Sequence, residues 1–283
     1  MTTLREKMKQ EMQLRGLSHG TQELYMRAVL KLHDYYKQSP AKLSESQIKD
    51  FLLFLLNKQS YAASTYNIMI HGLKFFYEVV IDKKMVAINL PRTKEPQKLP
   101  DILSASEVER IIKVTHNLKY RTILIITYGA GLRAAEVTSL RVKDIDRERS
   151  LIHIRQGKGL KDRYVMLSPL MLSSLQIYWK QCRLKAALEE NALLFLGRSG
   201  QALSGSSIGM MYQCSKRAAG ITKQGGIHAL RHAFATHALE SGADLYTIKQ
   251  LLGHASLTST VRYLRMTEKT VQKIQSPLER LSL

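Results

Sequence analysis

Three prolines within ten residues divide this 283-residue chain into two parts, at Pro91, Pro96 and Pro100. Each proline removes a backbone hydrogen-bond donor and fixes φ, so the segment between them cannot continue a helix. We therefore expect residues 91–100 to form an extended linker between a domain of residues 1–90 and a domain of residues 101–283. The side chains between the prolines include basic residues, Arg92, Lys94 and Lys98.

The first part shows helical periodicity and no strand-like alternation. Its apolar stripes lie on three expected helices: Leu24, Ala28, Leu32 and Tyr35 after Thr21; Ile48, Phe51, Leu52 and Leu55 after Ser44; Met69, Leu73, Phe76 and Val80 after Ser64. Ser44 and Gln47 also form a capping-box pattern at a helix start. Residues 1–90 are therefore predicted to be a small all-helical domain.

The second part mixes helices with one short hairpin. Ser104 and Glu107 form a second capping box. Helices are expected over 105–116, 120–129, 134–140, 169–186, 206–219, 229–241 and 244–252. Gly242 suits a helix end, and Asp244 can cap the next helix. Two β-capable runs within 151–167 flank a turn with Gly157 and Gly159, which predicts a β-hairpin. The fold class is mainly α with a small sheet.

The net charge limits the class of molecule that this chain is expected to bind. Lysine and arginine number 43 against 23 aspartates and glutamates, a net charge of +20. Such a field attracts polyanions and favours a nucleic-acid partner. A membrane surface is less favoured, because no long basic amphipathic helix stands apart from the cores. On this basis the linker over 91–100 either lies along a phosphate backbone or is simply solvated.

Composition also indicates the compartment. The two cysteines, Cys182 and Cys214, form neither a closely spaced zinc pair nor a disulfide framework. The charged start of the chain lacks the apolar core of a signal peptide, and apolar runs such as 122–128 are too short to cross a bilayer. We expect a cytoplasmic protein without a membrane partner.

Six residues are candidates for chemistry because of their type and local context: Arg133, Lys158, His228, Arg231, His254 and Tyr263. Each alone has an ordinary explanation as a surface, turn, capping or packing residue. Together they match what cutting a phosphodiester without a metal requires. Arginine forks neutralise charge on phosphate oxygens, and the reaction needs a nucleophile, a base for it and an acid for the leaving 5′-hydroxyl. A tyrosine nucleophile would store the bond energy covalently, so resealing would need no ATP.

The ordered segments that carry these residues resemble those of the tyrosine recombinase (phage integrase) family, especially its Xer-type members. They are Gly131-Leu-Arg-Ala-Ala-Glu136, Gly157-Lys-Gly-Leu-Lys-Asp-Arg163, His228-Ala-Leu-Arg-His232, Leu251-Leu-Gly-His254 and Tyr263. The stretch Leu17-Ser-His-Gly-Thr-Gln-Glu-Leu-Tyr25 resembles the start of the family's N-terminal core-binding, SAM-like domain. The resemblance covers nearly the whole chain.

The resemblance implies that Arg133 and Arg231 bind the scissile phosphate. Glu136 would support Arg133. Tyr263 would form a covalent 3′-phosphotyrosine.

It further implies that Lys158 protonates the leaving 5′-oxygen, with Lys161 of the same hairpin as the alternative acid. His228 would act as acid or base near the nucleophile, and His254 would bind a non-bridging oxygen. No cofactor or metal is expected. His228, His232 and His237 share one expected helix, but a metalloprotease-type zinc site would need glutamate where Ala229 stands.

At the level of assembly, the resemblance implies two domains that close on double-stranded DNA as a clamp. Four protomers, with or without a partner recombinase, would exchange strands through a Holliday junction in a nucleoid-associated, prokaryotic-type setting. The sequence after Tyr263 departs from the common Xer ending Tyr-Thr-His, which favours a mobile-element integrase over housekeeping resolution of chromosome or plasmid dimers. Parts of the pattern would also suit a type IB topoisomerase, which shares the chemistry, or a non-catalytic DNA-binding regulator on the same scaffold. The small N-terminal domain argues against the topoisomerase and the complete residue set against the regulator.

Overall fold

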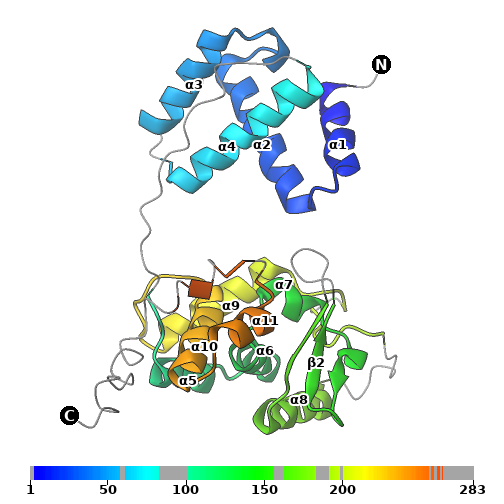
Figure 1. Ribbon diagram of the computed structural model, residues 1–283, viewed down its shortest axis with the longest axis vertical. Helices are drawn as coiled ribbons and strands as arrows, with labels where there is room; N and C mark the ends of the chain where they lie inside the picture. Colours follow the sequence, from blue (N-terminus) through cyan, green and yellow to red (C-terminus); the bar gives the residue numbers. More distant parts are fainter. Residues whose placement is uncertain are drawn as a thin grey trace, which may run out of the picture. The chain divides into compact units, whose positions relative to one another are not determined.

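The computed structural model describes residues 3–57, 61–82, 101–155, 162–182, 191–197, 200–254, 256–257, 260–261 and 263. The expected linker over 91–100 lies outside these residues. The chain divides into two compact units, Met1–Gln97 and Lys98–Leu283, and each has a hydrophobic core of its own (Figure 1).

The first unit is helical, as its apolar periodicity predicts. Its described helices are α1 (Leu4–Leu14), α2 (His19–Tyr36), α3 (Glu45–Asn57) and α4 (Ala63–Phe75), with a 3-10 turn η1 (Pro40–Lys42) before α3 and a π-helical turn η2 (Phe76–Val80) after α4. The capping box predicted before α3 is confirmed: the Ser44 N–H donates to Gln47 Oε1 at 2.9 Å, and the Gln47 N–H donates to Ser44 Oγ at 3.3 Å. No pattern named above predicted α1, which opens with a capping box of its own.

Two of the three predicted stripes are confirmed in full, because every member is buried: Ile48, Phe51, Leu52, Leu55, Met69, Leu73, Phe76 and Val80. The stripe on α2 is only half right. Ala28 and Leu32 are buried, whereas Leu24 is 41% and Tyr35 43% exposed. Helix α4 packs on the middle of α2, where Gly72 allows a close approach: a Cβ at Gly72 would lie 2.9 Å from the Cα of Tyr25. Tyr35, at one end of the stripe, contacts the rings of Phe51 and Phe54 on α3 instead.

The second unit is also mainly helical. Its described helices are α5 (Ala105–Val114), α6 (Leu118–Gly129), α7 (Ala134–Ser139), α8 (Pro169–Cys182), α9 (Gly205–Ala218), α10 (His228–Glu240) and α11 (Leu245–Leu252). The predicted helices are confirmed over the described residues, with most ends shifted by one or two residues, and the predicted end of the helix over 169–186 lies outside those residues. The predicted caps are also present: the Ser104 N–H donates to Glu107 Oε2 at 2.7 Å, and the Asp244 carboxylate accepts the N–H groups of Tyr246 and Thr247 at 2.9 Å.

A three-stranded antiparallel sheet lies beside these helices, in the order β1 (Ile145–Asp146), β2 (Leu151–Ile154) and β3 (Arg163–Met166). Strands β2 and β3 are the predicted hairpin, with Leu151 opposite Met166 and Ile154 opposite Arg163. Strand β1 has two residues, too few to show alternation in the sequence, and follows a 3-10 turn η4 (Val142–Asp144). The hairpin turn itself lies outside the described residues.

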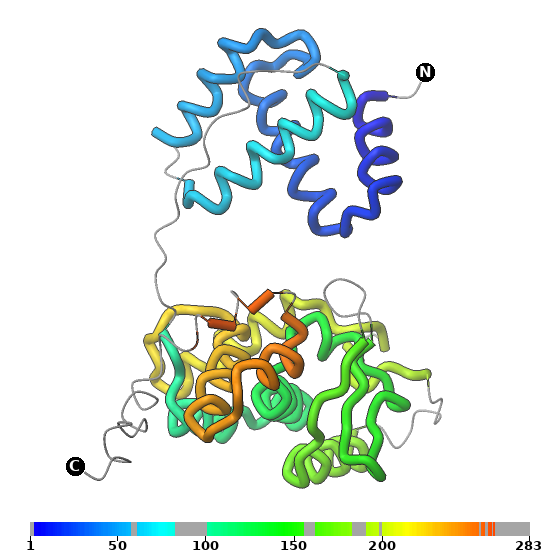
Figure 2. Tube along the Cα trace, viewed as in Figure 1, coloured from blue at the N-terminus to red at the C-terminus, as the bar shows by residue number. Residues whose placement is uncertain are grey.

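Helix α6 lies at the centre of this unit and packs against α8 and α10 (Figure 2). Helix α10 is almost wholly interior, with Ala229, Leu230, Ala233 and Ala235 all buried. A charged residue on the buried side of such a helix must find polar partners in the core. Arg231 is such a residue. Within the described residues, every helix falls short of the length and apolar character needed to span a bilayer.

Candidate active site

Arg231 enters the core of the second unit on α10 with none of its surface exposed. Its Nη1 donates to the carbonyl of Gly131 at 2.7 Å, and its Nη2 donates to the carbonyl of Leu252 at the end of α11. Its Nε has no hydrogen-bond partner. A buried unsatisfied donor is costly, so this guanidinium is held in place by the fold while one of its hydrogen-bonding positions stays open.

Arg133 lies at the start of α7 and is fixed by the glutamate three residues later. Its backbone N–H donates to Glu136 Oε2 at 2.8 Å, and its Nη1 donates to Glu136 Oε1 at 2.7 Å. Its Nη2 reaches the carbonyl of Gly253 at 3.4 Å. Glu136 therefore caps the helix and orients the arginine together, the supporting role that the family resemblance implied.

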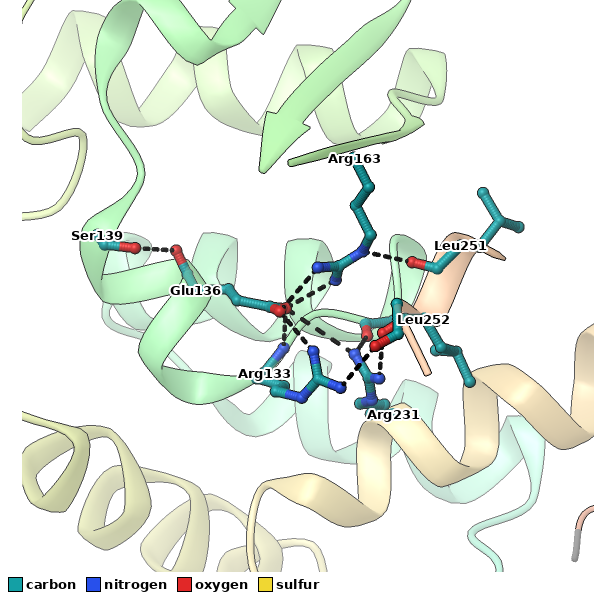
Figure 3. Close-up of polar contacts among 9 residues, drawn as sticks. Arg133, Glu136, Ser139, Arg163, Arg231, Leu251 and Leu252 are labelled. Atoms are coloured by element: carbon teal, nitrogen blue, oxygen red, sulfur yellow. Dashed lines mark hydrogen bonds and ion pairs between the residues drawn. The ribbon is translucent and has the colours of Figure 1, made fainter. Parts of the chain in front are cut away.

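Arg163 on β3 completes this cluster. Its Nη1 and Nη2 donate to Oε1 and Oε2 of Glu136, both at 2.8 Å, and its Nε donates to the carbonyl of Leu251 at 2.7 Å (Figure 3). Figure 3 shows the Glu136 carboxylate between the guanidinium groups of Arg133, Arg163 and Arg231, and the last lies 3.8 Å from it. The Arg163 fork ties the hairpin to α7 and α11.

The sequence patterns gave Arg163 no role. The sequence did contain a signal for Arg163, because this residue is the last of the family-like segment Gly157-Lys-Gly-Leu-Lys-Asp-Arg163. The bidentate geometry that Arg163 makes with Glu136, 27 residues away in sequence, cannot be read from spacing.

Opposing effects set the protonation of this cluster. Burial by itself would raise the pKa of Glu136, but hydrogen bonds from Arg163 and Arg133 and their charges lower it to about 2. Burial, and then the charge of Arg133, lower the pKa of Arg231 to about 9. At neutral pH the carboxylate and Arg231 are both charged. Three arginines with one carboxylate leave a local net charge of +2, which favours an anion.

Tyr263 lies against the same helix, buried with 1% of its surface exposed, in a cluster with Phe234, Ile248 and Leu252. Its hydroxyl is 2.9 Å from Nδ1 of His232 on α10. The charge of a Tyr263 phenolate would raise the pKa of Arg231, so the two groups are within electrostatic reach of one another. The structure thus brings together the candidate nucleophile and the candidate phosphate-binding arginine.

The other two histidines lie beside this pair. The ring of His254 stacks on that of Tyr263 with 6.3 Å between centroids and 13° between planes, and its Nδ1 is 2.8 Å from Thr260 Oγ1. His228, exposed at the start of α10, meets the ring of His232 edge-on at 4.8 Å. His232 is therefore the second residue that the sequence patterns missed as part of the site. The available signal was its position four residues after His228, one helical turn along α10.

His237 stands apart from this group. Its Nδ1 is 2.9 Å from the hydroxyl of Tyr128. His232 and His237 are thus each within hydrogen-bond distance of a tyrosine hydroxyl. Among the described residues, no group of three or more His, Cys, Asp or Glu side chains gathers as a metal site would require.

Lys158 and Lys161 lie outside the described residues, so the choice between them as the acid stays a prediction. The strands on either side of their turn are described. Strand β3 brings Arg163 to the arginine cluster directly after that turn.

Comparison with known proteins places this geometry in a family. A model of the phage integrase family matches residues 101–270, and a model of the phage integrase N-terminal SAM-like domain matches residues 4–86. The chain is 39% identical over 283 residues to the integrase/recombinase y4qK of Sinorhizobium fredii, covering 99% of this chain and 90% of that protein. It is 31% identical over 266 residues to the tyrosine recombinase XerA of Pyrococcus horikoshii, covering 93% of this chain and 88% of that protein.

Comparison of the fold with solved structures agrees with the sequence comparison. The crystal structure of the XerH site-specific recombinase, bound to a palindromic difH substrate after cleavage, matches with a TM-score of 0.70 at 25% identity and covers 94% of this chain and 82% of that one. The chain therefore belongs to the phage integrase family, and it is a Xer-like tyrosine recombinase, an enzyme that cleaves and rejoins DNA at specific sites.

Proposed function

We propose that Tyr263 is the nucleophile of this recombinase and forms a 3′-phosphotyrosine link while Arg133 and Arg231 bind the scissile phosphate. One observation carries this proposal. Arg231 is a wholly buried cation whose Nε has no hydrogen-bond partner, and its Nη2 donates to the carbonyl of Leu252, a residue of the buried cluster that contains Tyr263. A phosphate oxygen would accept the hydrogen bond that this Nε does not make, and it would balance part of the net charge of +2 that remains beside the Glu136 carboxylate.

The arginine cluster suits the charge that develops in the reaction. Negative charge grows on the phosphate oxygens in the transition state, and fixed donors that need not reorganise stabilise it most. Arg231 is fixed by two backbone carbonyls and Arg133 by Glu136. Both guanidinium groups are therefore in place before the phosphate arrives.

The remaining roles follow the family pattern. Lys158, or else Lys161, protonates the leaving 5′-oxygen. His228 is exposed at the helix start, where a substrate can reach it, and acts in proton transfer. His254, which is stacked on the nucleophile, binds a non-bridging oxygen. The cations of this mechanism are side chains.

The partner is double-stranded DNA bearing recombination sites, for which the net charge of +20 is suited. Four protomers on two synapsed sites would exchange strands in two steps. The relation to y4qK, described as an integrase/recombinase, supports a mobile-element role, and the relation to XerA supports resolution of chromosome or plasmid dimers as the second candidate. Mapping the DNA bound by the protein separates them. Sites at the ends of an element support the first role, and one chromosomal site supports the second.

The nucleophile is tested with Tyr263→Phe on a nicked DNA substrate that traps the covalent product. This variant loses only the hydroxyl, so it should bind DNA normally and form no adduct that survives denaturation. Tyr246→Phe is the matched control, because Tyr246 is 58% exposed on α11, and it should form adducts like the parent protein. An adduct with Tyr263→Phe would place the nucleophile elsewhere.

A further inference from the structure

The hydrogen bond between Tyr263 and His232 assigns a partner to the nucleophile that differs from the histidine of the family pattern. Nδ1 of His232 lies 2.9 Å from the tyrosine hydroxyl, within the range of a hydrogen bond along which a proton can pass. His232 is half-buried one turn into α10, directly after Arg231. The helix that presents the phosphate-binding arginine therefore also presents this imidazole.

The two neighbouring histidines are arranged differently. The ring of His254 lies nearly parallel to that of Tyr263, with 6.3 Å between centroids, and its Nδ1 is 2.8 Å from Thr260 Oγ1. Nδ1 of His254 is therefore engaged by Thr260, whereas Nδ1 of His232 is at hydrogen-bond distance from the tyrosine hydroxyl. His228 contacts the ring of His232, and its exposed position suits contact with the substrate.

We propose that His232 is the group that takes the proton of Tyr263 during cleavage and returns it during resealing. The inference rests on the proposed role of Tyr263 as nucleophile. In cleavage the O–H bond of Tyr263 breaks, its proton moves to Nδ1 of neutral His232, and the phenolic oxygen forms the new bond to phosphorus. The bond from phosphorus to the 5′-oxygen breaks, and a separate acid supplies the proton for that oxygen. Resealing reverses each transfer.

The charge of Arg231 favours one half of this transfer, the loss of the proton from Tyr263. A nearby positive charge stabilises a phenolate, and Arg231 is within electrostatic reach of Tyr263. Among the described residues, the titratable and charged groups around the pair include His228 and Arg231 on α10, and His254 after α11. His228 and His254 are also imidazoles, so the test must separate them from His232.

The key variant is His232→Asn. The asparagine amide stands near the position of Nδ1 and can still hydrogen-bond the tyrosine hydroxyl, but it cannot take up a proton near neutral pH. His232→Gln is a second polar replacement in case the first unfolds. His237→Asn is the matched control, because His237 lies on the same helix and its Nδ1 also contacts a tyrosine hydroxyl at 2.9 Å. Thermal unfolding and DNA affinity are measured for each variant.

Single-turnover cleavage is followed on a nicked DNA whose scissile bond has sulfur in place of the bridging 5′-oxygen. Sulfur leaves without protonation, so this substrate removes the need for the acid and isolates the base. We expect the folded His232 variant to cleave this substrate about 10²- to 10⁴-fold more slowly than the parent protein. His237→Asn should stay within about threefold, the scatter expected for a change away from the reacting atoms.

The pH profile separates proton transfer from mere positioning. The cleavage rate of the parent protein should rise with pH as an imidazole loses its proton, and the rate of the His232→Asn variant should no longer depend on pH in this way. The His228→Asn variant should cleave more slowly but should keep the pH dependence of the parent. A His232→Asn enzyme that cleaves within a few-fold of the parent rate, with the parent pH profile, would overturn the proposal. So would an equal loss in His237→Asn, which would indicate general damage to α10. An adduct formed by Tyr263→Phe would instead refute the proposed nucleophile itself.

Discussion

The two halves of the site are built from different interactions. The arginine–glutamate cluster, comprising Arg133, Glu136, Arg163 and Arg231, is charged, and each of its arginines donates to a backbone carbonyl. The tyrosine–histidine group, comprising Tyr263, His232, His228 and His254, is aromatic. Its described contacts run from side chain to side chain. One half is attached to the main chain of several elements, and the other is joined through rings and a hydroxyl.

This difference matches what each half has to do. Charge stabilisation is strongest when the donors are already in place, so anchoring to the main chain favours catalysis. The nucleophile has to exchange its proton for a phosphorus bond and later reverse the exchange. A hydrogen bond between two side chains can break and re-form without disturbing the fold. Substitutions in the first half should therefore cost both stability and rate, and those in the second mainly rate.

The largest combined effect is expected for Glu136→Gln. This change keeps the shape of the side chain but leaves three arginines around a neutral amide. Removing one partner of a buried ion pair costs about 3–5 kcal/mol of stability. Cleavage should fall by about 10²- to 10³-fold, because Arg133 loses its orienting partner. Urea unfolding and single-turnover cleavage measure the two effects.

Glu109→Gln is the control for that substitution. Glu109 makes an ion pair with Lys113 on α5, but its side chain is 61% exposed. Its loss should change stability little, because solvent screens an exposed ion pair, and should leave cleavage unchanged. Equal destabilisation by the two changes would show that the buried cluster is not the anchored half described above.

The Glu136 carboxylate should make the free energy of unfolding depend on pH in acid. Its pKa is about 2 in the folded protein against an ordinary value of 4.5, so the ionised form is favoured by folding. The stabilisation is complete above the unfolded pKa and is lost as pH falls towards the folded one. Between about pH 5 and pH 2 the parent protein should lose on the order of 3 kcal/mol more than Glu136→Gln. Denaturant titrations at several pH values test this, and parallel curves would contradict it.

A smaller effect is expected for Arg163→Lys. A single ammonium cannot hold both oxygens of Glu136 and the carbonyl of Leu251, as the guanidinium does. A small misplacement of a group near the reacting atoms costs about 10²-fold, so cleavage should fall by about 10- to 100-fold with DNA affinity retained.

Arg155→Lys controls for the change of side chain. Arg155 also donates through Nε to a buried carboxylate, that of Asp144 at 2.6 Å, but its own side chain is 43% exposed. Its cleavage rate should stay near that of the parent. Combined with Glu136→Gln, the Arg163→Lys change should add little further loss, because both act on one contact. If the losses in cleavage rate from the two changes were fully additive, Arg163 would act independently of Glu136.

The sequence predicted the elements better than the contacts within the site. Helices, caps and the hairpin follow from local patterns, such as Ser104 with Glu107, and the structure confirms them. The family pattern named Arg133, Arg231 and Tyr263, which the structure brings together. It contained Arg163 and His232 but gave neither of them a role. Their roles depend on contacts across 27 and 31 residues of sequence, which are made only when β3, α10 and Tyr263 are packed. Pairing at that distance leaves no periodic trace.

The smallest effect is expected for Gly253→Ala, which probes how tightly the arginine half is packed. Gly253 ends α11 with φ +62°, and an added Cβ would lie 3.1 Å from Cδ and 3.2 Å from Nη1 of Arg163. Gly220→Ala is the matched control, because Gly220 has φ +67° and open space around it. Both changes should cost about 1–2 kcal/mol in urea unfolding, because alanine is strained in the left-handed region. Only Gly253→Ala should also slow cleavage, by about 5- to 10-fold, because Arg163 has to shift and Glu136 with it. Equal cleavage rates for the two variants would mean that the position of Arg163 does not limit the reaction. The arginine–glutamate cluster would then contribute to the stability of the fold and not to the cleavage rate.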